Sequence, residues 1–297
     1  MTPAPDIVCI GSVLWDVVGR SSAHMRLGSD VPGRIARVPG GVAMNVAMTL
    51  AQFGMRPALL SAVGRDAEGA ALIAECDARG LLTGHLYRSD DLPTDTYMAV
   101  EGANGLIAAI ADAHSLEAAG DRILRPLADG RLGSADRPWQ GAVVLDGNLT
   151  EMLLAQIADS ALFAAADLRV APASPGKAQR LRPLLRHPHA TLYVNLEEAS
   201  LLAHRPFDTA PAAAAGLVAE GAARVLVTDG SAPAAEAGHR GTREARPPEV
   251  LVTRVTGAGD TFLAAHIAAE HRGQDPDAAL DTALRAAAAY VSGDVPA

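Results

Sequence analysis

The sequence has few of the residues that build disulfide frameworks, stacking platforms or basic binding patches. Its two cysteines, Cys9 and Cys76, lie in apolar patterns, so we expect buried, reduced thiols. Aromatic residues make up only 3% of the 297 residues, which leaves few side chains for stacking against a ligand. The net charge of −9 argues against a nucleic acid as partner. A small-molecule ligand is the better expectation.

Long apolar runs and targeting signals are missing as well. No apolar stretch is long and uninterrupted enough to span a bilayer, no dense basic run suggests a membrane surface, and the opening MTPAPD lacks a basic n-region. The nine histidines are scattered, and the close pair His187 and His189 flanks a proline, which is typical of a loop and not of a zinc site. We therefore expect a cytoplasmic protein without a membrane partner.

Short apolar runs alternate with longer helical patterns along the chain. This alternation predicts an α/β fold, a three-layer αβα sandwich with a mostly parallel central sheet, in one domain over residues 1–297. In such sheets, ligands bind beyond the carboxyl ends of the strands. The candidate strands are 7–11, 58–63, 141–146, 168–173, 191–196 and 224–229, and the candidate helices are 42–54, 70–80, 150–165, 197–204 and 212–222.

Two segments interrupt this alternation. Residues 34–40 and 97–112 both have the composition of strands, and Asn104-Gly105 lies where the second segment should reverse as a hairpin. They predict a small β appendage, within segments of about 12–39 and 92–112, that covers the strand ends as a lid and excludes water. Its exposed strand edges could pair with a second copy to form a homodimer.

Glycines precede two helical patterns. Gly40-Gly41 comes before 42–54, whose first turns hold Asn45, and RVTGAGDTF (254–262) comes before FLAAHIAAEH. Glycines at a helix start let a ligand approach the free N–H groups closely, which favours an anion. Taken alone, Asp260 is more simply a helix cap than a catalytic group.

Together, the motifs have a recognisable order. GGVAMNVAMTLAQFG, VGRDAEG and VTGAGDTF resemble the two signatures of the ribokinase-like carbohydrate kinases of the phosphofructokinase-B type. The resemblance implies that Gly257, Ala258 and Gly259 form an anion hole for the transferring phosphoryl group, and that Asp260 takes the proton of the acceptor hydroxyl. Phosphoryl transfer needs such charge stabilisation and such a base.

The resemblance also implies a sugar-binding set. It places Asp16, Gly40, Gly41 and Asn45 against the sugar hydroxyls, and a carboxylate with an amide suits vicinal diols. Asn148, which follows a predicted strand, is a further candidate for this pocket.

Two shorter stretches bear on the acceptor. TDTYMAVEGANGLIAAIADAHSL and APASPGKAQRL are similar to the pseudouridine kinases of the family, which implies transfer to the 5′-hydroxyl of pseudouridine and adds Thr96 and Tyr97 to the substrate side. Tyr97 could instead pack within the lid. Ribose, another nucleoside or a related sugar remain alternative acceptors, and a non-catalytic nucleoside-binding sensor is an alternative of another class.

The resemblance implies ATP and Mg²⁺ as cofactors. Asn195 and Glu198 of NLEE match the motif linked to magnesium, through water, and Thr228 and Gly230 of VTDG match the nucleotide-binding turn. Lys177 is the only lysine among 25 basic residues, which is either compositional chance or a compact charge near the ATP phosphates.

The chain departs from the family before the second signature. Many relatives carry an acid there, whereas this sequence has Arg254-Val255. A monovalent-cation site built with that acid is therefore in doubt, and we do not assume activation by potassium.

Overall fold

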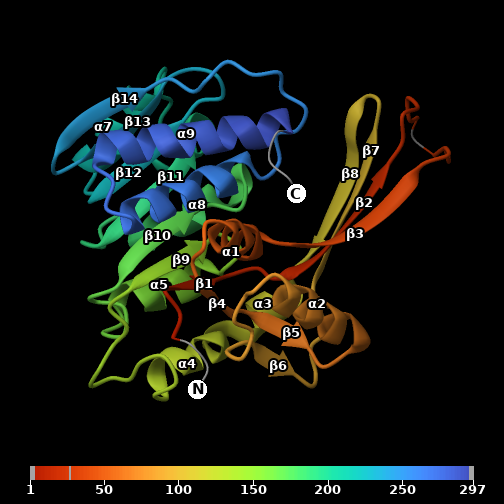
Figure 1. Ribbon diagram of the computed structural model, residues 1–297, viewed down its shortest axis with the longest axis horizontal. Coiled ribbons are helices and arrows are strands. Elements are labelled where there is room, and N and C mark those ends of the chain that lie inside the picture. Colours follow the sequence, from red (N-terminus) through yellow and green to blue (C-terminus); the bar gives the residue numbers. More distant parts are fainter. Residues whose placement is uncertain (1–3, 27, 294–297) are drawn as a thin grey trace.

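A large, mostly parallel sheet forms the centre of the computed structural model, which describes residues 4–26 and 28–293 (Figure 1). Neighbouring strands are parallel except at one edge, where the last two run antiparallel. β1 is apolar throughout and β9 is apolar up to its last residue, as expected of strands covered on both faces. The spatial order is β14 (Gly241–Ala245), β13 (Ala234–Gly238), β12 (Arg224–Thr228), β11 (Ala190–Asn195), β10 (Asp167–Ala171), β9 (Ala142–Asp146), β1 (Ile7–Ile10) and β4 (Pro57–Leu60).

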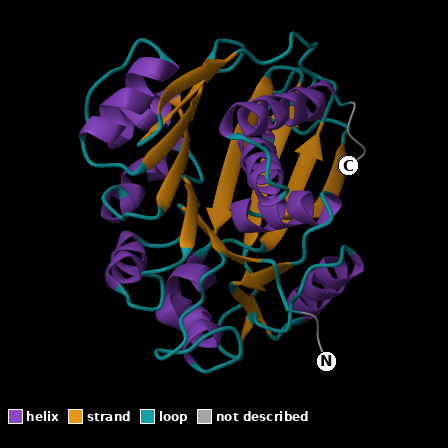
Figure 2. Cartoon of the chain, turned by 60° about the vertical axis from the view of Figure 1, so that its left-hand side comes forward, coloured by secondary structure: helices purple, strands orange, loops and turns teal. Residues whose placement is uncertain are grey.

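Helices cover both faces of this sheet and enclose two apolar cores (Figure 2). The predicted αβα architecture is thus confirmed. One core holds α1 (Val42–Gln52), α2 (Ala67–Ala78), α8 (Ala258–His271) and α9 (Pro276–Ser292). The other holds α3 (His114–Ala119), η1 (Gly120–Leu124), α4 (Arg125–Ala128), α5 (Glu151–Asp159), η2 (Pro175–Leu184), α6 (Leu196–Leu202) and α7 (Ala210–Ala219).

A second, small sheet projects from the body (Figure 1). It contains both segments predicted as an appendage, in the order β3 (Arg34–Gly40), β2 (Leu14–Arg20), β7 (Thr96–Gly102) and β8 (Gly105–Asp112). The hairpin between β7 and β8 turns through Ala103 and Asn104, one residue earlier than predicted. The central pair β2–β7 is parallel and the outer pairs are antiparallel.

The two faces of the small sheet differ in chemistry. The strand register places Asp16 opposite Tyr97 on one face, whereas Met98 and Ile110 oppose each other on the other. Ile35 lies on the same face as Met98, and the three apolar side chains Ile35, Met98 and Ile110 are 80%, 46% and 63% exposed. We call the face that carries Asp16 and Tyr97 the polar face, although Val38 lies on it too, and we call the opposite face, which also carries Arg37, the apolar face.

Some predicted boundaries were wrong. The apolar run 58–63 is split, because its end leaves the large sheet as β5 (Ala62–Gly64) and pairs with β6 (Tyr87–Ser89). The predicted helix 150–165 ends at Asp159, because Ser160 has an extended conformation. The predictions also lacked β2, the antiparallel pair β13–β14 and the long helix α9.

Both cysteines are free and buried, as expected. Across residues 4–26 and 28–293, none of the helices combines the length and hydrophobicity that a bilayer crossing requires.

Candidate active site

The buried carboxylate of Asp146 joins three segments at the carboxyl edge of the large sheet. Its Oδ2 accepts hydrogen bonds from the N–H of Ser12 (2.8 Å), from the hydroxyl of Ser12 (2.9 Å) and from the N–H of Ala43 (3.0 Å). Its Oδ1 accepts one from the N–H of Asn148 (2.8 Å). A Cβ on Gly11 would overlap this carboxylate, so that position requires glycine. The start of α1 is thereby fixed to the ends of β1 and β9.

Gly40 and Gly41 bring the backbone close to the same place. A Cβ on Gly40 would overlap the Asp16 carboxylate, and one on Gly41 would overlap the Ser12 carbonyl. Gly41 also has φ +96°, which disfavours other residues. The N–H of Val42 donates to Ser12 Oγ (2.9 Å), so the first amides of α1 bind protein groups and the glycines provide close packing.

Asn45 and Asp260 connect α1 to α8. The Asn45 Nδ2 donates to Asp260 Oδ2 at 2.9 Å, although the two residues are 215 positions apart. Burial raises the pKa of Asp260 to about 7; the Asn45 hydrogen bond opposes this, and the charges of Asp146, Asp16 and Glu198 add to it. The structure thus brings together the two aspartates and the asparagine singled out from the sequence, with a carboxyl group that titrates near neutrality.

The GAGD turn begins α8. Gly257 is left-handed (φ +89°), and its carbonyl accepts the first helical hydrogen bond from the N–H of Thr261 (3.0 Å). The N–H groups of Gly259 and Asp260 therefore lie in the first turn, where intrahelical acceptors are missing and the helix dipole favours an anion. The N–H of Ala258 instead donates to the Val255 carbonyl (3.1 Å).

The polar face of the small sheet adds Asp16 and Tyr97. Burial raises the pKa of Asp16 to about 6, and burial together with the Asp16 charge raises the pKa of Tyr97. Thr96 precedes Tyr97 on β7 and pairs with Trp15, so its side chain belongs to the opposite face. Asp16 and Tyr97 are therefore neighbours, whereas Thr96 points to the other side of the sheet.

The nucleotide candidates lie on adjacent strands. Asn195 ends β11 opposite Thr228 at the end of β12, and Gly230 follows with φ +55°. Asn195 and Glu198 form a capping box: the Asn195 side chain accepts from the Glu198 N–H (2.8 Å), and Glu198 Oε2 accepts from the Asn195 N–H (2.9 Å). Burial raises the pKa of Glu198, which the Asn195 N–H partly offsets.

This donor set suits magnesium held through water. The capping box engages Glu198 Oε2 and leaves Oε1 as the carboxylate oxygen that could accept from metal-bound waters. Within the described part of the chain, no three His, Cys, Asp or Glu residues converge as a metal cage. A single carboxylate near substrate phosphates is how Mg²⁺ is commonly held, whereas a zinc-type site would need more ligands.

Lys177 contacts Asn148, which the sequence predicts as a candidate for the substrate pocket. Its Nζ donates to Asn148 Oδ1 (2.6 Å), and Asn148 Nδ2 donates to Ser12 Oγ (2.8 Å). Burial and the nearby Arg180 lower the pKa of Lys177. Lys177 therefore belongs to the hydrogen-bond network of Asp146, a connection that sequence spacing does not reveal.

Ser12 and Asp146 are site residues that the sequence predictions lacked. One feature of the sequence points to Asp146: it is a charged residue at the end of the apolar strand AVVLD. Ser12, which directly follows β1 and Gly11, has no motif of its own, and only the fold shows that five hydrogen bonds meet on its backbone and hydroxyl.

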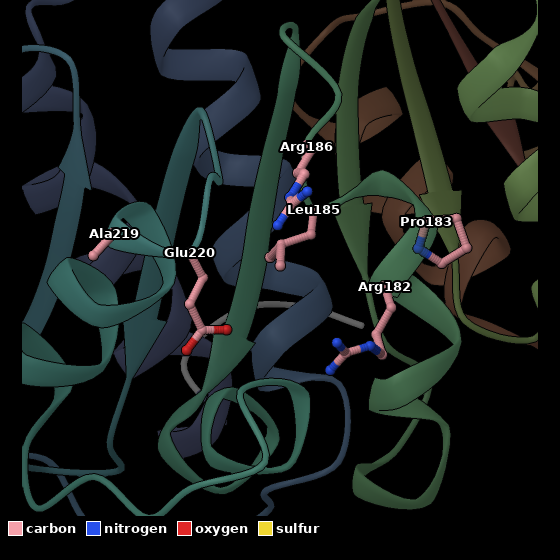
Figure 3. Close-up of a pocket in the computed structure, with 6 residues that line it drawn as sticks. All are labelled: Arg182, Pro183, Leu185, Arg186, Ala219 and Glu220. Carbon is pink, nitrogen blue, oxygen red and sulfur yellow. The ribbon is translucent and has the colours of Figure 1, made fainter.

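A cavity of about 550 Å³ lies elsewhere (Figure 3). Leu185 and Arg186 in its wall precede β11, and Ala219 and Glu220 precede β12, so it adjoins the amino ends of these strands. The candidate active site lies at their carboxyl ends, and this cavity is separate from it.

Two solved ribokinases superpose on almost the whole chain. The ribokinase of Arabidopsis thaliana, solved with ribose and ATP, superposes with a TM-score of 0.76 at 22% identity, over 99% of this chain and 94% of that one. The ribokinase of Thermotoga maritima gives a TM-score of 0.79 at 21% identity, over 99% and 96%. At these identities the likeness establishes a ribokinase-like fold.

The family model of the pfkB family carbohydrate kinases matches residues 4–294, and the chain belongs to this family. A pseudouridine kinase of Escherichia coli is 30% identical over 267 residues, which cover 87% of this chain and 81% of the relative. A ribokinase of Bacillus subtilis is 29% identical, over 96% and 92%. The protein is a sugar or nucleoside kinase of the ribokinase family.

The raised pKa of Asp260 makes stability depend on pH. Between its ordinary value near 4 and about 7, the folded state keeps a proton that the unfolded state releases, so the free energy of unfolding falls as pH rises through this window. Asp260→Asn removes this loss. We expect it to raise the free energy of unfolding by about 1–3 kcal/mol at pH 8 and to change it little at pH 4, measured by urea denaturation.

The exposed Asp159 provides the control, because Asp159→Asn should have a similar effect at both pH values. If the difference between Asp260→Asn and the wild type were independent of pH, the Asp260 carboxyl group would have an ordinary pKa.

Proposed function

We propose that the protein transfers the γ-phosphoryl group of ATP to the 5′-hydroxyl of pseudouridine. The observation that carries the proposal is the partly buried Asp260, held by Asn45 at the N-terminus of α8. A base with a pKa near 7, next to free backbone N–H groups, matches what phosphoryl transfer to an alcohol needs. The similarity to a pseudouridine kinase of Escherichia coli supports the acceptor.

The transfer is a direct in-line displacement. Asp260 accepts the proton of the 5′-hydroxyl as its oxygen bonds to the γ-phosphorus, the bond from that phosphorus to the bridging oxygen breaks, and ADP leaves with the electron pair. The N–H groups of Gly257, Gly259 and Asp260 in the GAGD turn stabilise the charge on the transferring group, whereas the Ala258 N–H, which the family resemblance also assigns to this anion hole, already donates to the Val255 carbonyl. No covalent enzyme intermediate is needed.

The substrate side is organised around the start of α1. Asp16 accepts hydrogen bonds from the ribose hydroxyls and Asn45 donates to them and accepts from them. Gly40 and Gly41 allow the close packing that keeps the Asp16 carboxylate and Ser12 beside the start of α1. Tyr97, opposite Asp16 on the polar face of the small sheet, covers the acceptor. Closure of this sheet as a lid excludes water, which would otherwise compete with the hydroxyl for the phosphoryl group.

The nucleotide side uses the ends of β11 and β12. Thr228 and Gly230 contact the nucleotide, and Glu198, oriented by Asn195, holds magnesium through water. Magnesium supplies charge neutralisation to the phosphates when it is bound.

Ribose, another nucleoside or a related sugar is the second candidate acceptor, because a ribokinase of Bacillus subtilis also aligns along most of the chain. A panel of acceptors separates these candidates. We expect MgATP-dependent phosphorylation of pseudouridine in preference to uridine, cytidine, adenosine, ribose and fructose, measured by ADP release.

In Asp260→Asn, kcat should fall by about 10²–10⁴-fold with a small change in KM.

Each outcome is informative. Preference for another member of the panel would replace the acceptor and keep the kinase. Tight nucleoside binding by calorimetry without turnover of any acceptor would indicate a non-catalytic sensor.

We expect a substitution of Lys177 to lower kcat even when it keeps the positive charge. Lys177→Arg introduces a wider, planar group that would displace Asn148 from Ser12, so we expect kcat to fall by about five- to fifty-fold in steady-state assays. Arg186→Lys, at the cavity beside the amino ends of the strands, is the control. Equal kcat values for Lys177→Arg and the wild type would remove Lys177 from the site.

The apolar face of the small sheet suits a second copy of this chain. Ile35, Met98 and Ile110 expose apolar surface away from Asp16, and sheet faces of this kind are commonly covered by a partner. We expect a dimer by light scattering, which Ile110→Lys converts to a monomer, whereas Met152→Lys, on an exposed helix position, has no effect. A monomeric wild type would contradict this homodimer.

A further inference from the structure

The segment that enters the GAGD turn is anchored on the C-terminal end of α9. The N–H and the hydroxyl of Thr253 donate to the Val291 carbonyl (2.8 and 3.0 Å), and the Arg254 N–H donates to the same oxygen (3.2 Å). The Arg254 side chain donates from Nε to the Tyr290 carbonyl (2.8 Å). These carbonyls belong to the last turn of a helix, where acceptors lack intrahelical donors and a cation is favoured.

Tyr290 extends this anchor to the turn itself. Its hydroxyl donates to the Thr256 carbonyl (3.0 Å), and the Arg254 guanidinium lies over its ring, 3.8 Å from the centroid. A Cβ on Gly257 would come within 2.5 Å of the same hydroxyl. Arg254 therefore holds the ring, and the ring holds the residues that enter the left-handed Gly257.

A bound alkali cation does not suit this place. Such an ion needs several free oxygen ligands, but the carbonyls of Tyr290, Thr256 and Val291 already accept N–H or O–H donors. Arg254 occupies the position where an acidic side chain could have been a ligand. Its fixed positive charge repels a second cation. The residues present therefore do not fit a monovalent-cation site at this place.

We infer that Arg254, through Tyr290, is a positioning residue for the phosphoryl-binding turn and replaces a bound monovalent cation. The guanidinium holds the C-terminal end of α9 against the turn at every physiological pH and in any salt. The catalytic part of this inference rests on the proposed kinase function, whereas the independence from alkali cations is a property of the folded chain.

The first experiment needs no substrate. Thermal unfolding is compared in KCl, NaCl and choline chloride at a common ionic strength of about 0.15 M, so that screening is equal. A cation that binds the folded state raises Tm with its concentration. We expect the wild-type Tm to agree in the three salts within about 1 °C. A Tm that rises with KCl but not with choline chloride would overturn the inference.

The second experiment tests positioning. Arg254→Gln should lower kcat about tenfold or more with the acceptor KM within about twofold, because the turn is displaced and the acceptor site is intact. Tyr290→Phe keeps the ring, loses the bond to Thr256 and should lower kcat in the same way by a smaller factor. Arg254→Lys keeps the charge without the planar stacking and should recover only part of the loss.

Arg272→Gln is a matched control. Arg272 also lies over an aromatic ring, that of Phe53, and donates to its carbonyl (2.6 Å), but at the far end of α8. It should leave kcat unchanged. Wild-type kcat in both Arg254→Gln and Tyr290→Phe would overturn the positioning role, whereas a wild type that phosphorylates no acceptor would overturn the proposed function and leave the Tm comparison decisive.

Discussion

The hydrogen bonds to the buried carboxylate of Asp146 are the interactions on which the geometry of the candidate site depends. A buried carboxylate is costly unless donors satisfy it, and here the donors come from Ser12, Ala43 and Asn148. Each donor begins a different part of the site: Ser12 leads into the small sheet with Asp16, Ala43 begins the helix with Asn45, and Asn148 leads to Lys177. A single charge therefore sets the relative positions of groups that are far apart in sequence, and Asn45 extends this order to Asp260.

Negative charge accumulates around Asp260, and this has a chemical consequence. Burial acts first, and Asp146, Asp16 and Glu198 then add like charges that raise its pKa to about 7. A carboxylate at its ordinary pKa near 4 would be a weak base toward an alcohol, whereas one near 7 is both ionised and basic at neutral pH. The α8 N-terminus and Lys177 provide the positive counterpart. A carboxylate and free N–H groups in one helical turn suit a reaction in which an alcohol loses a proton while an anionic phosphoryl group approaches the same turn.

The sequence predicted most of the architecture, because continuous apolar runs and helical periodicity reflect burial on both faces of a parallel sheet. The predictions from the sequence were wrong or incomplete where pairing between distant segments decides the structure. The run 58–63 is apolar except for Ser61, yet Ala62 begins a strand that pairs with Tyr87. Gly40, Gly41 and Asp260 could be found because they belong to linear motifs. Ser12 could not, and Asp146 stood out only as a charge at the end of an apolar strand, since their importance lies in hydrogen bonds between residues 134 positions apart. For the same reason, neither the sequence around Lys177 nor that around Asn148 predicts the contact between them.

The GAGD turn illustrates how a conformationally free residue is held in one conformation. A left-handed Gly257 has no conformational preference strong enough to hold it in one state, because glycine visits both signs of φ. The surroundings must fix it from both sides. Downstream, Asp260 is held by Asn45, so the proposed base is joined to α1, the helix proposed to bind the acceptor. Upstream, Thr256 is held by Tyr290 on α9, which Arg254 in turn holds. Because one anchor is attached to the substrate side and the other to the end of the last helix, loosening either would misalign the base and the anion hole relative to each other. Binding energy alone cannot compensate for such a misalignment, since phosphoryl transfer depends on both groups meeting the same reacting atoms.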